Sequence, residues 1–181
     1  IDPKKGLDLL APALRRVKAQ FADVHAVIAG PDNIGFRPTA EHFFAEAGCE
    51  EYVTFTGMLT GELKQAALAA ADVFVAPSYS EGFSISVLEA LVAGIPSVIT
   101  TGCNFPEAGE AGAASVVAPQ SSEIGDAIAA YLTDSEEAKQ VGKVAQKFIL
   151  ENYTWDRIAA NLIEVYTAIL NQKPLPFQYE H

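Results

Sequence analysis

Short apolar runs alternate with longer amphipathic stretches along most of the 181 residues. The short runs, such as HAVIA at 25–29 and DVFVA at 72–76, are rich in apolar residues and end at Gly or Pro. Such runs predict buried strands that enter turns. The longer stretches, such as DLLAPALRRVKAQF at 8–21, place apolar residues at helical spacing. The chain is therefore predicted to alternate strands with helices.

Strands are predicted over residues 25–29, 52–56, 72–76, 97–100 and 114–118. Helices are predicted over 8–21, with Pro12 at a bend or in the first turn, and over 39–47, 62–71, 85–93, 123–132, 136–150 and 156–170. Ser135 and Thr154 suit the N-cap positions of the last two helices. Residues 174–181 contain two prolines and no periodicity, and we expect them to form an extended arm.

Apolar strands that alternate with helices are typical of a parallel sheet covered on both sides. We therefore expect one α/β domain, a Rossmann-like parallel sheet flanked by helices, over residues 1–173, followed by the tail at 174–181. Ligands of such sheets lie at the carboxyl ends of the strands. The candidate loops are then residues 30–31, 57–58, 77–82 and 101–107.

Composition excludes several classes of function. The net charge of −11 argues against general nucleic-acid binding, which requires clustered Lys and Arg. No apolar run approaches the roughly 18 residues of a membrane span, and no signal peptide opens the chain. We therefore expect a cytoplasmic protein.

Two residue types that often form special sites show no such pattern here. Cys49 and Cys103 lie far apart without a C-x-x-C partner, and we expect free thiols rather than a disulfide. The spacing of His25, His42 and His181 does not match paired metal ligands, so no metal site is expected.

The segment PSYSEGFSISVLEALVAG at 77–94 is the strongest candidate for chemistry. A strand is expected to end at its start, a polar loop follows, and a helix begins near Ser84. Gly82 lets the backbone approach a ligand closely. The amides of Phe83, Ser84, Ile85 and Ser86 would be the unpaired donors of the first helical turn, which is an anion site.

Glu81 and Glu89 lie on either side of those amides. Eight helical residues rise about 12 Å, so the two carboxylates suit an elongated ligand with hydroxyl-rich groups on both sides of a phosphate. In the alternative interpretation, Glu81 is an ordinary acid before a helix and Glu89 belongs to core packing. The residues alone leave both interpretations open.

The same segment resembles the E-x7-E motif of retaining glycosyltransferases of the GT-B fold, the group 1 family. The shared register comprises Pro77-Ser78, Glu81-Gly82-Phe83, Leu88-Glu89-Ala90 and Gly94-Ile95-Pro96. The family usually has Gly at the position of Ser84, which contributes a backbone amide. The resemblance extends from Lys4-Lys5-Gly6 to Trp155 and Tyr166 and implies the C-terminal, donor-binding half of a GT-B enzyme.

The resemblance implies a role for each matching residue. Glu81 would contact hydroxyls of the transferred sugar, the amides from Phe83 to Ser86 would hold a diphosphate, and Glu89 would bind ribose hydroxyls. Lys5 would neutralise the departing diphosphate, although without the resemblance it would be a solvated surface lysine. Leu59 would face the nucleobase. The 102–107 loop departs from the family pattern at Cys103-Asn104, so no role is assigned to Asn104 or Glu107.

The resemblance further implies that the substrate is a nucleoside diphosphate sugar and that neither a metal nor another cofactor is needed. The leaving phosphate would help to deprotonate an acceptor hydroxyl on the same face of the sugar. The acceptor, which the family allows to be membrane-associated, would be bound mainly by an N-terminal domain not contained in this chain. A first strand would also be missing between the strands at His25 and Asp72, so we expect a gap there that residues upstream of Ile1 or another chain would fill. We expect the chain alone to be inactive.

Three other classes of function differ from this one in what they require of the sequence. A glycoside hydrolase needs two facing carboxyls about 5–10 Å apart, whereas Glu81 and Glu89 would lie along one helix. A dinucleotide-binding oxidoreductase is disfavoured because no G-x-G-x-x-G follows a strand. A non-catalytic module that binds a nucleotide or a protein partner stays open as the alternative.

Overall fold

The computed structural model describes residues 1–176, so five residues of the predicted tail, His181 among them, lie outside the described part. The fold is α/β, as predicted, and all strand pairs are parallel. The strands are β1 (Ala26–Ala29), β2 (Val53–Gly57), β3 (Phe74–Ala76), β4 (Ser97–Thr100) and β5 (Ser115–Val117). All five lie where the apolar runs predicted them.

The strands form two sheets rather than one. β1 pairs with β2, whereas β3, β4 and β5 form a second sheet in that order. No ladder joins β1 to β3 within residues 1–176. A gap was expected between the strands at His25 and Asp72, and these two strands indeed belong to different sheets. That residues upstream of Ile1 or another chain fill this gap stays a prediction.

The strands were predicted to be buried on both faces, but this holds for only part of them. All four residues of β4 are buried, as expected for a strand covered on both faces. In β1 and β2 inward and outward positions alternate, and the side chain of Val27 is 55% exposed. The first sheet is thus only partly buried, and on one face alone, because apolar residues in a strand do not by themselves supply a layer to cover them.

Helices precede, separate and follow the strands along the chain. They are α1 (Leu7–Lys18), α2 (Arg37–Glu46), α3 (Gly61–Ala69), α4 (Ile85–Val92), α5 (Pro106–Glu110), α6 (Ser121–Thr133), α7 (Ser135–Asn152) and α8 (Trp155–Leu170), with 3-10 turns at Pro3–Lys5, Glu50–Tyr52 and Thr101–Cys103. The short α5 and the three 3-10 turns were not predicted, since they are too brief to show a period. Pro12 lies inside α1.

The two N-cap predictions have different outcomes. Thr154 caps α8, and its hydroxyl accepts a hydrogen bond from the Arg157 amide. Ser135 is not the cap of α7, because the Asp134 carboxylate takes that place and accepts from the amides of Glu136 and Glu137. An ionised carboxylate complements the helix dipole, which a hydroxyl cannot do.

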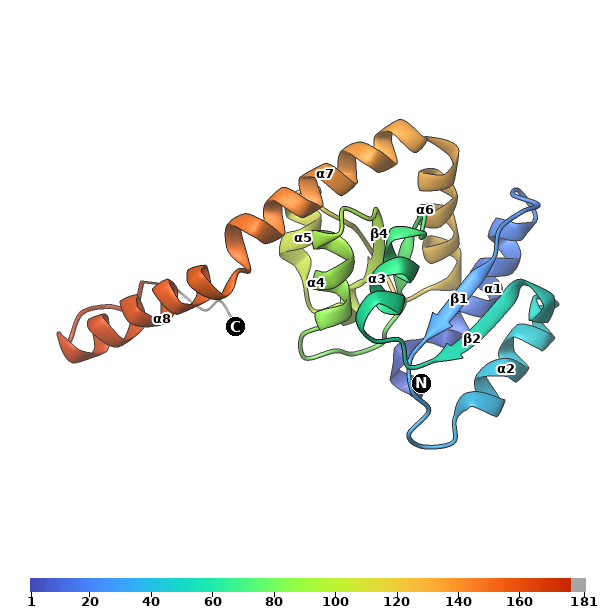
Figure 1. Cartoon of the computed structure of the whole chain (residues 1–181), viewed down its shortest axis with the longest axis horizontal. Helices are drawn as coiled ribbons and strands as arrows, with labels where there is room; N and C mark the ends of the chain where they lie inside the picture. The colour runs from blue at the N-terminus through green and yellow to red at the C-terminus, as the bar shows by residue number, and fades with distance from the viewer. Residues whose placement is uncertain (177–181) are drawn as a thin grey trace.

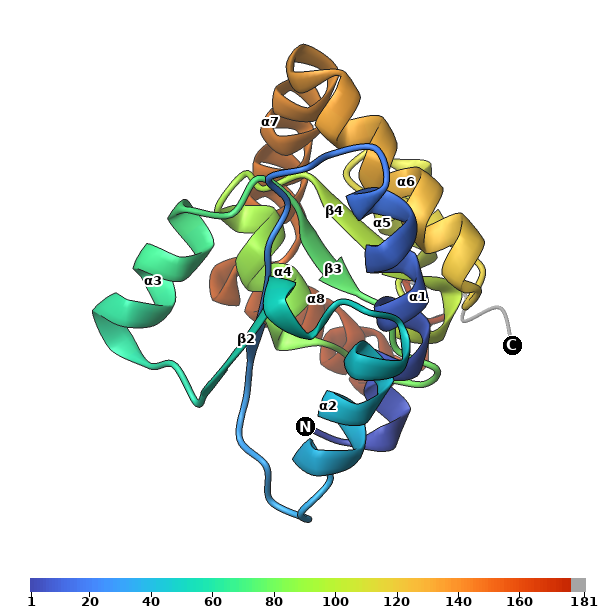
Figure 2. The same ribbon diagram turned by 90° about the vertical axis from the view of Figure 1, so that its right-hand side faces the viewer.

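Two helix pairs build the core. α1 packs against α6, and both views show them side by side (Figure 1, Figure 2). Their buried residues form one cluster with Phe44 of α2 and Val98 of β4. α4 packs against α7 over a second cluster that includes Ile99 of β4. Cys49 lies in the first cluster and Cys103 in the second, and both are buried free thiols.

Helix α8 extends away from the rest of the fold (Figure 1). Ala168 is its one buried residue, whereas large apolar side chains such as Trp155 and Leu170 are more than four-fifths exposed. No helix in residues 1–176 combines the length and apolar character that crossing a membrane requires.

The α4–α7 contact depends on a glycine. A Cβ on Gly142 would lie 2.0 Å from the carbonyl oxygen of Gly94. Helix propensity alone would make Gly142→Ala about 1 kcal/mol more stable. We instead expect the clash to lower the free energy of unfolding by about 1–3 kcal/mol, measured by urea denaturation.

Gln140→Ala is the matched control, because Gln140 is an exposed position on the same helix. Its effect should stay within about 0.5 kcal/mol. If Gly142→Ala were as stable as the unaltered protein, the two helices would not be in the close contact described.

Candidate functional site

The candidate site begins where the first turn of the chain meets the loop after β3. Gly6 adopts a left-handed conformation with φ of 68°, and a Cβ there would lie 2.0 Å from the carbonyl oxygen of Pro77. The amide of Tyr79 donates to the carbonyl of Lys4 at 2.8 Å. The Tyr79 hydroxyl donates to the Asp8 carboxylate at 2.6 Å, and burial together with this bond raises the pKa of Tyr79 to about 12. These contacts fix the loop that carries Glu81.

Glu81 has polar partners from three segments of the chain. Its side chain is 10% exposed, and its Oε1 accepts from Lys5 Nζ at 2.5 Å and from Ser78 Oγ at 2.9 Å. The Glu81 amide donates to the carbonyl of Gly102 at 2.7 Å. Burial acts to raise the pKa of Glu81, but the bonds from Lys5 and Ser78 outweigh it and lower the pKa below its ordinary value of 4.5. The Glu81 side chain is therefore ionised at neutral pH.

The backbone after Glu81 offers free donors. α4 starts at Ile85, and Ser84 takes the N-cap position with an extended backbone and no side-chain cap bond. Ser84 and Ser86 bond to each other through their hydroxyls at 3.0 Å. Among the described residues no acceptor pairs with the amides from Gly82 to Ser86, and the first bonded amide is that of Val87. The predicted helix start is thus present and its donors are available to an anion.

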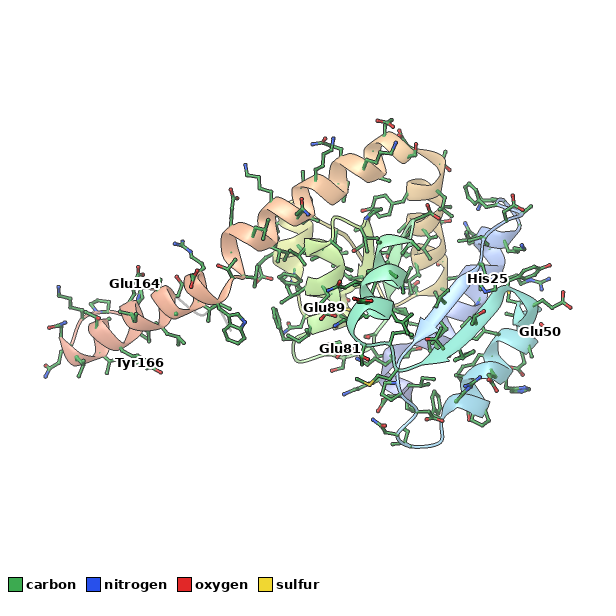
Figure 3. The ribbon with its side chains drawn as sticks, viewed as in Figure 1. His25, Glu50, Glu81, Glu89, Glu164 and Tyr166 are labelled. Atoms are coloured by element: carbon green, nitrogen blue, oxygen red, sulfur yellow. The ribbon has the colours of Figure 1, made fainter. Side chains whose placement is uncertain are left out.

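Glu89 follows one helical turn later, on α4. Its Oε1 accepts from Lys64 Nζ of α3 at 2.5 Å, and the two side chains are 35% and 41% exposed. Both predicted carboxylates are labelled in Figure 3, where they lie near α4 and α3. Each carboxylate is therefore paired with a lysine. Along the chain, the free amides lie between the two carboxylates.

Two residues beside the carboxylates were missed from the sequence. Ser78 is buried and lies within the shared register of the motif, but no role was assigned to it from the sequence. Lys64 had no signal, because its contact with Glu89 joins helices 25 residues apart. Leu59, the predicted base contact, lies in the turn between β2 and α3, on the segment that leads to Lys64.

The segment from Thr100 to Gly102 contacts the loop that carries Glu81 through hydrogen bonds to its backbone. Thr100 donates to the carbonyl of Ser78, and Gly102 accepts from Glu81. Cys103 is buried, which raises the pKa of its thiol. No three His, Cys, Asp or Glu side chains in residues 1–176 come together as metal ligands would.

An aromatic cluster holds Phe83, which the helix start leaves 48% exposed. Its ring stacks on Tyr153 with centroids 6.0 Å apart and meets Phe105 edge-on at 5.7 Å. Phe148 of α7 completes the cluster through Phe105 and Tyr153. The cluster therefore joins the loop of the candidate site to the junction between α7 and α8.

Comparison with solved structures places the fold. The structure of the C-terminal domain of a group 1 glycosyl transferase, LpcC, from Francisella tularensis is similar with a TM-score of 0.74 and 22% identity, over 86% of this chain and 83% of that one. Anabaena HepE in complex with UDP-glucose is similar with a TM-score of 0.82 and 22% identity, over 93% of this chain and 46% of that one. The fold is that of the C-terminal half of a GT-B glycosyltransferase.

Sequence comparison identifies the family. Residues 1–148 match the family described as "Glycosyl transferases group 1", and the chain belongs to it. One relative is the GDP-mannose-dependent alpha-(1-6)-phosphatidylinositol monomannoside mannosyltransferase of Mycobacterium tuberculosis. It is 29% identical over an alignment of 171 positions that covers 90% of this chain and 44% of that protein. The chain thus spans less than half the length of this relative.

Lys5→Met tests the ion pair between Lys5 and Glu81. Burial of Glu81 remains when the ammonium group is removed, so we expect the pKa of the Glu81 carboxyl to rise, as measured by carboxyl-carbon NMR. Because the folded pKa of Glu81 is lowered, the stability that it contributes is present above pH 4.5 and lost as the pH falls through the folded pKa. The variant should be about 1–2 kcal/mol less stable at pH 7, and the difference should shrink below pH 4.5.

Lys139→Met, which breaks an exposed pair with Glu136, is the control and should leave the pKa of Glu81 unchanged. An unchanged pKa of Glu81 in Lys5→Met would contradict the assigned pairing.

Tyr153→Ala tests the aromatic cluster. Loss of the ring should lower the free energy of unfolding by about 2–4 kcal/mol and move the ring proton shifts of Phe83 toward those of an unstructured peptide. Tyr153→Phe should preserve both properties, since stacking needs only the ring. Tyr166→Ala, at an exposed position of α8, should change neither. If Tyr153→Ala left the Phe83 shifts unchanged, the stacking would not hold that loop.

Proposed function

We propose that this chain is the donor-binding domain of a retaining glycosyltransferase, which moves a sugar from a nucleoside diphosphate sugar to an acceptor hydroxyl. The observation that carries this proposal is the run of free amides at the start of α4 between two lysine-paired carboxylates. Amides at a helix start favour a phosphate, and carboxylates accept hydrogen bonds from the hydroxyls of a sugar or a ribose.

In this proposal each residue has a defined role. The amides of Phe83, Ser84, Ile85 and Ser86, with Gly82 allowing close approach, bind the diphosphate. Lys5 neutralises the charge that the diphosphate gains as it leaves, and Glu81 orients the transferred sugar. At the other end Glu89 binds the ribose hydroxyls and Leu59 contacts the base.

The proposed reaction exchanges one glycosidic bond for another on the same face of the sugar. The bond from the anomeric carbon to the diphosphate oxygen breaks, and a bond from that carbon to the acceptor oxygen forms. The acceptor proton passes to the departing phosphate, so the protein mainly stabilises developing negative charge. No further cofactor takes part in this scheme.

The acceptor site is proposed to lie mainly on an N-terminal domain. The chain covers 44% of the M. tuberculosis relative, whose name gives a phosphatidylinositol monomannoside as acceptor, so a membrane-associated acceptor fits the proposal. A non-catalytic nucleotide-binding module is the alternative, and it would share the donor site. The two functions predict different outcomes for the longer parent protein: a glycosyltransferase would transfer sugar, whereas a binding module would not. The present chain alone should bind a donor without transferring sugar.

A binding screen tests the donor site. The relatives named above are described with GDP-mannose and UDP-glucose, so UDP-, GDP- and ADP-sugars should each be titrated by calorimetry. We expect at least one to bind, and Glu89→Ala to weaken that binding by about 10- to 100-fold, the loss of a charge-assisted hydrogen-bond pair.

Glu137→Ala is the control, because Glu137 is an exposed acid on α7 far from the proposed site in the chain. Glu137→Ala should bind the nucleotide sugar with the same dissociation constant as the unaltered protein. Absence of binding by every nucleotide sugar, or equal binding by Glu89→Ala, would refute the donor-site assignment.

A further inference from the structure

Helix α3 has few links to the rest of the protein. None of its residues is buried, and Figure 2 shows it at the periphery of the fold. Among the described residues, the bond from Lys64 Nζ to Glu89 Oε1 at 2.5 Å is the one side-chain hydrogen bond or ion pair that α3 makes to another element. Within residues 1–176 this bond is therefore the one polar side-chain link from α3 to α4.

Stability does not account for this pair. The two side chains are 41% and 35% exposed, and ion pairs in such settings contribute little to the free energy of folding because water screens them. The pair does have a geometric effect, since it holds the Glu89 carboxylate in one orientation. Lys64 occupies Oε1, which leaves Oε2 free to accept further hydrogen bonds.

Lys64 also connects the two residues proposed to contact the nucleoside, Leu59 and Glu89. It lies five residues after Leu59, in the helix that begins at Gly61 directly after the Leu59 turn. The Lys64–Glu89 bond thus ties the segment that carries Leu59 to the carboxylate on α4. A displaced lysine would free both the carboxylate and the turn.

We propose that Lys64 is a positioning residue for nucleoside recognition: it orients Glu89 so that Oε2 accepts from the ribose hydroxyls. This inference rests on the proposed donor-binding function. Lys64 acts through Glu89, so its effect on affinity depends on the presence of those hydroxyls. That dependence separates it from a lysine that attracts the diphosphate directly.

The test measures dissociation constants by calorimetry for the nucleoside diphosphate that the protein binds best and for its 2′,3′-dideoxy counterpart. Lys64→Met should weaken binding of the ribonucleotide by about 3- to 10-fold, part of the loss of one charge-assisted contact. Binding of the dideoxynucleotide should change less than about twofold, within the error of such a comparison. Lys64→Arg should keep most of the affinity because it retains the cation.

Two further variants complete the design. In a Glu89→Gln background, the added Lys64→Met change should have little effect, because the carboxylate through which Lys64 acts is gone. Lys139→Met removes a lysine from a more exposed pair with Glu136 on α7 and should bind both nucleotides like the unaltered protein. Melting temperatures of Lys64→Met and Lys139→Met should agree, which excludes a general loss of structure.

Each contrary result has a distinct meaning. Equal weakening for both nucleotides would overturn the inference, since Lys64 would then act on the phosphates. Unchanged binding in Lys64→Met would also overturn it and would make the contact a simple surface pair. If the unaltered protein bound no nucleotide, the proposed function would fail first and this inference with it.

Discussion

The backbone at Gly6 lies so close to the carbonyl of Pro77 that no side chain fits between them. This contact brings the first turn of the chain against the loop after β3. As a result Lys5 reaches Glu81, although 76 residues separate them in sequence. That loop leads directly into α4, so the orientation of the free amides and of Glu89 depends on the same contact.

Charge at the candidate site differs from the charge of the protein as a whole. The chain carries a net charge of −11, which by itself would repel a diphosphate. At the start of α4, however, Lys5 balances Glu81 and Lys64 balances Glu89. The helix amides between the two pairs then provide a net attraction for an anion. The net negative charge of the chain therefore does not argue against the phosphate-bearing ligand proposed for this site.

Much of the fold was predictable because it depends on local patterns. The five strands and the longer helices follow from apolar periodicity and from Gly or Pro stops. Short elements such as α5 were not predictable, since five residues are too few for a period to appear. The exposure of Val27 was also missed, because the pattern of one strand does not show which layers cover it.

The strand–loop–helix order at 77–94 could be inferred from local sequence, since it depends on neighbouring residues and on the conformational freedom of Gly82. Local sequence also determined that two carboxylates lie on either side of a helix start. Three features became visible only in three dimensions: each carboxylate has a lysine partner, Tyr153 stacks on Phe83, and β1 and β3 belong to different sheets. These features depend on contacts between segments distant in the chain, which no local pattern records.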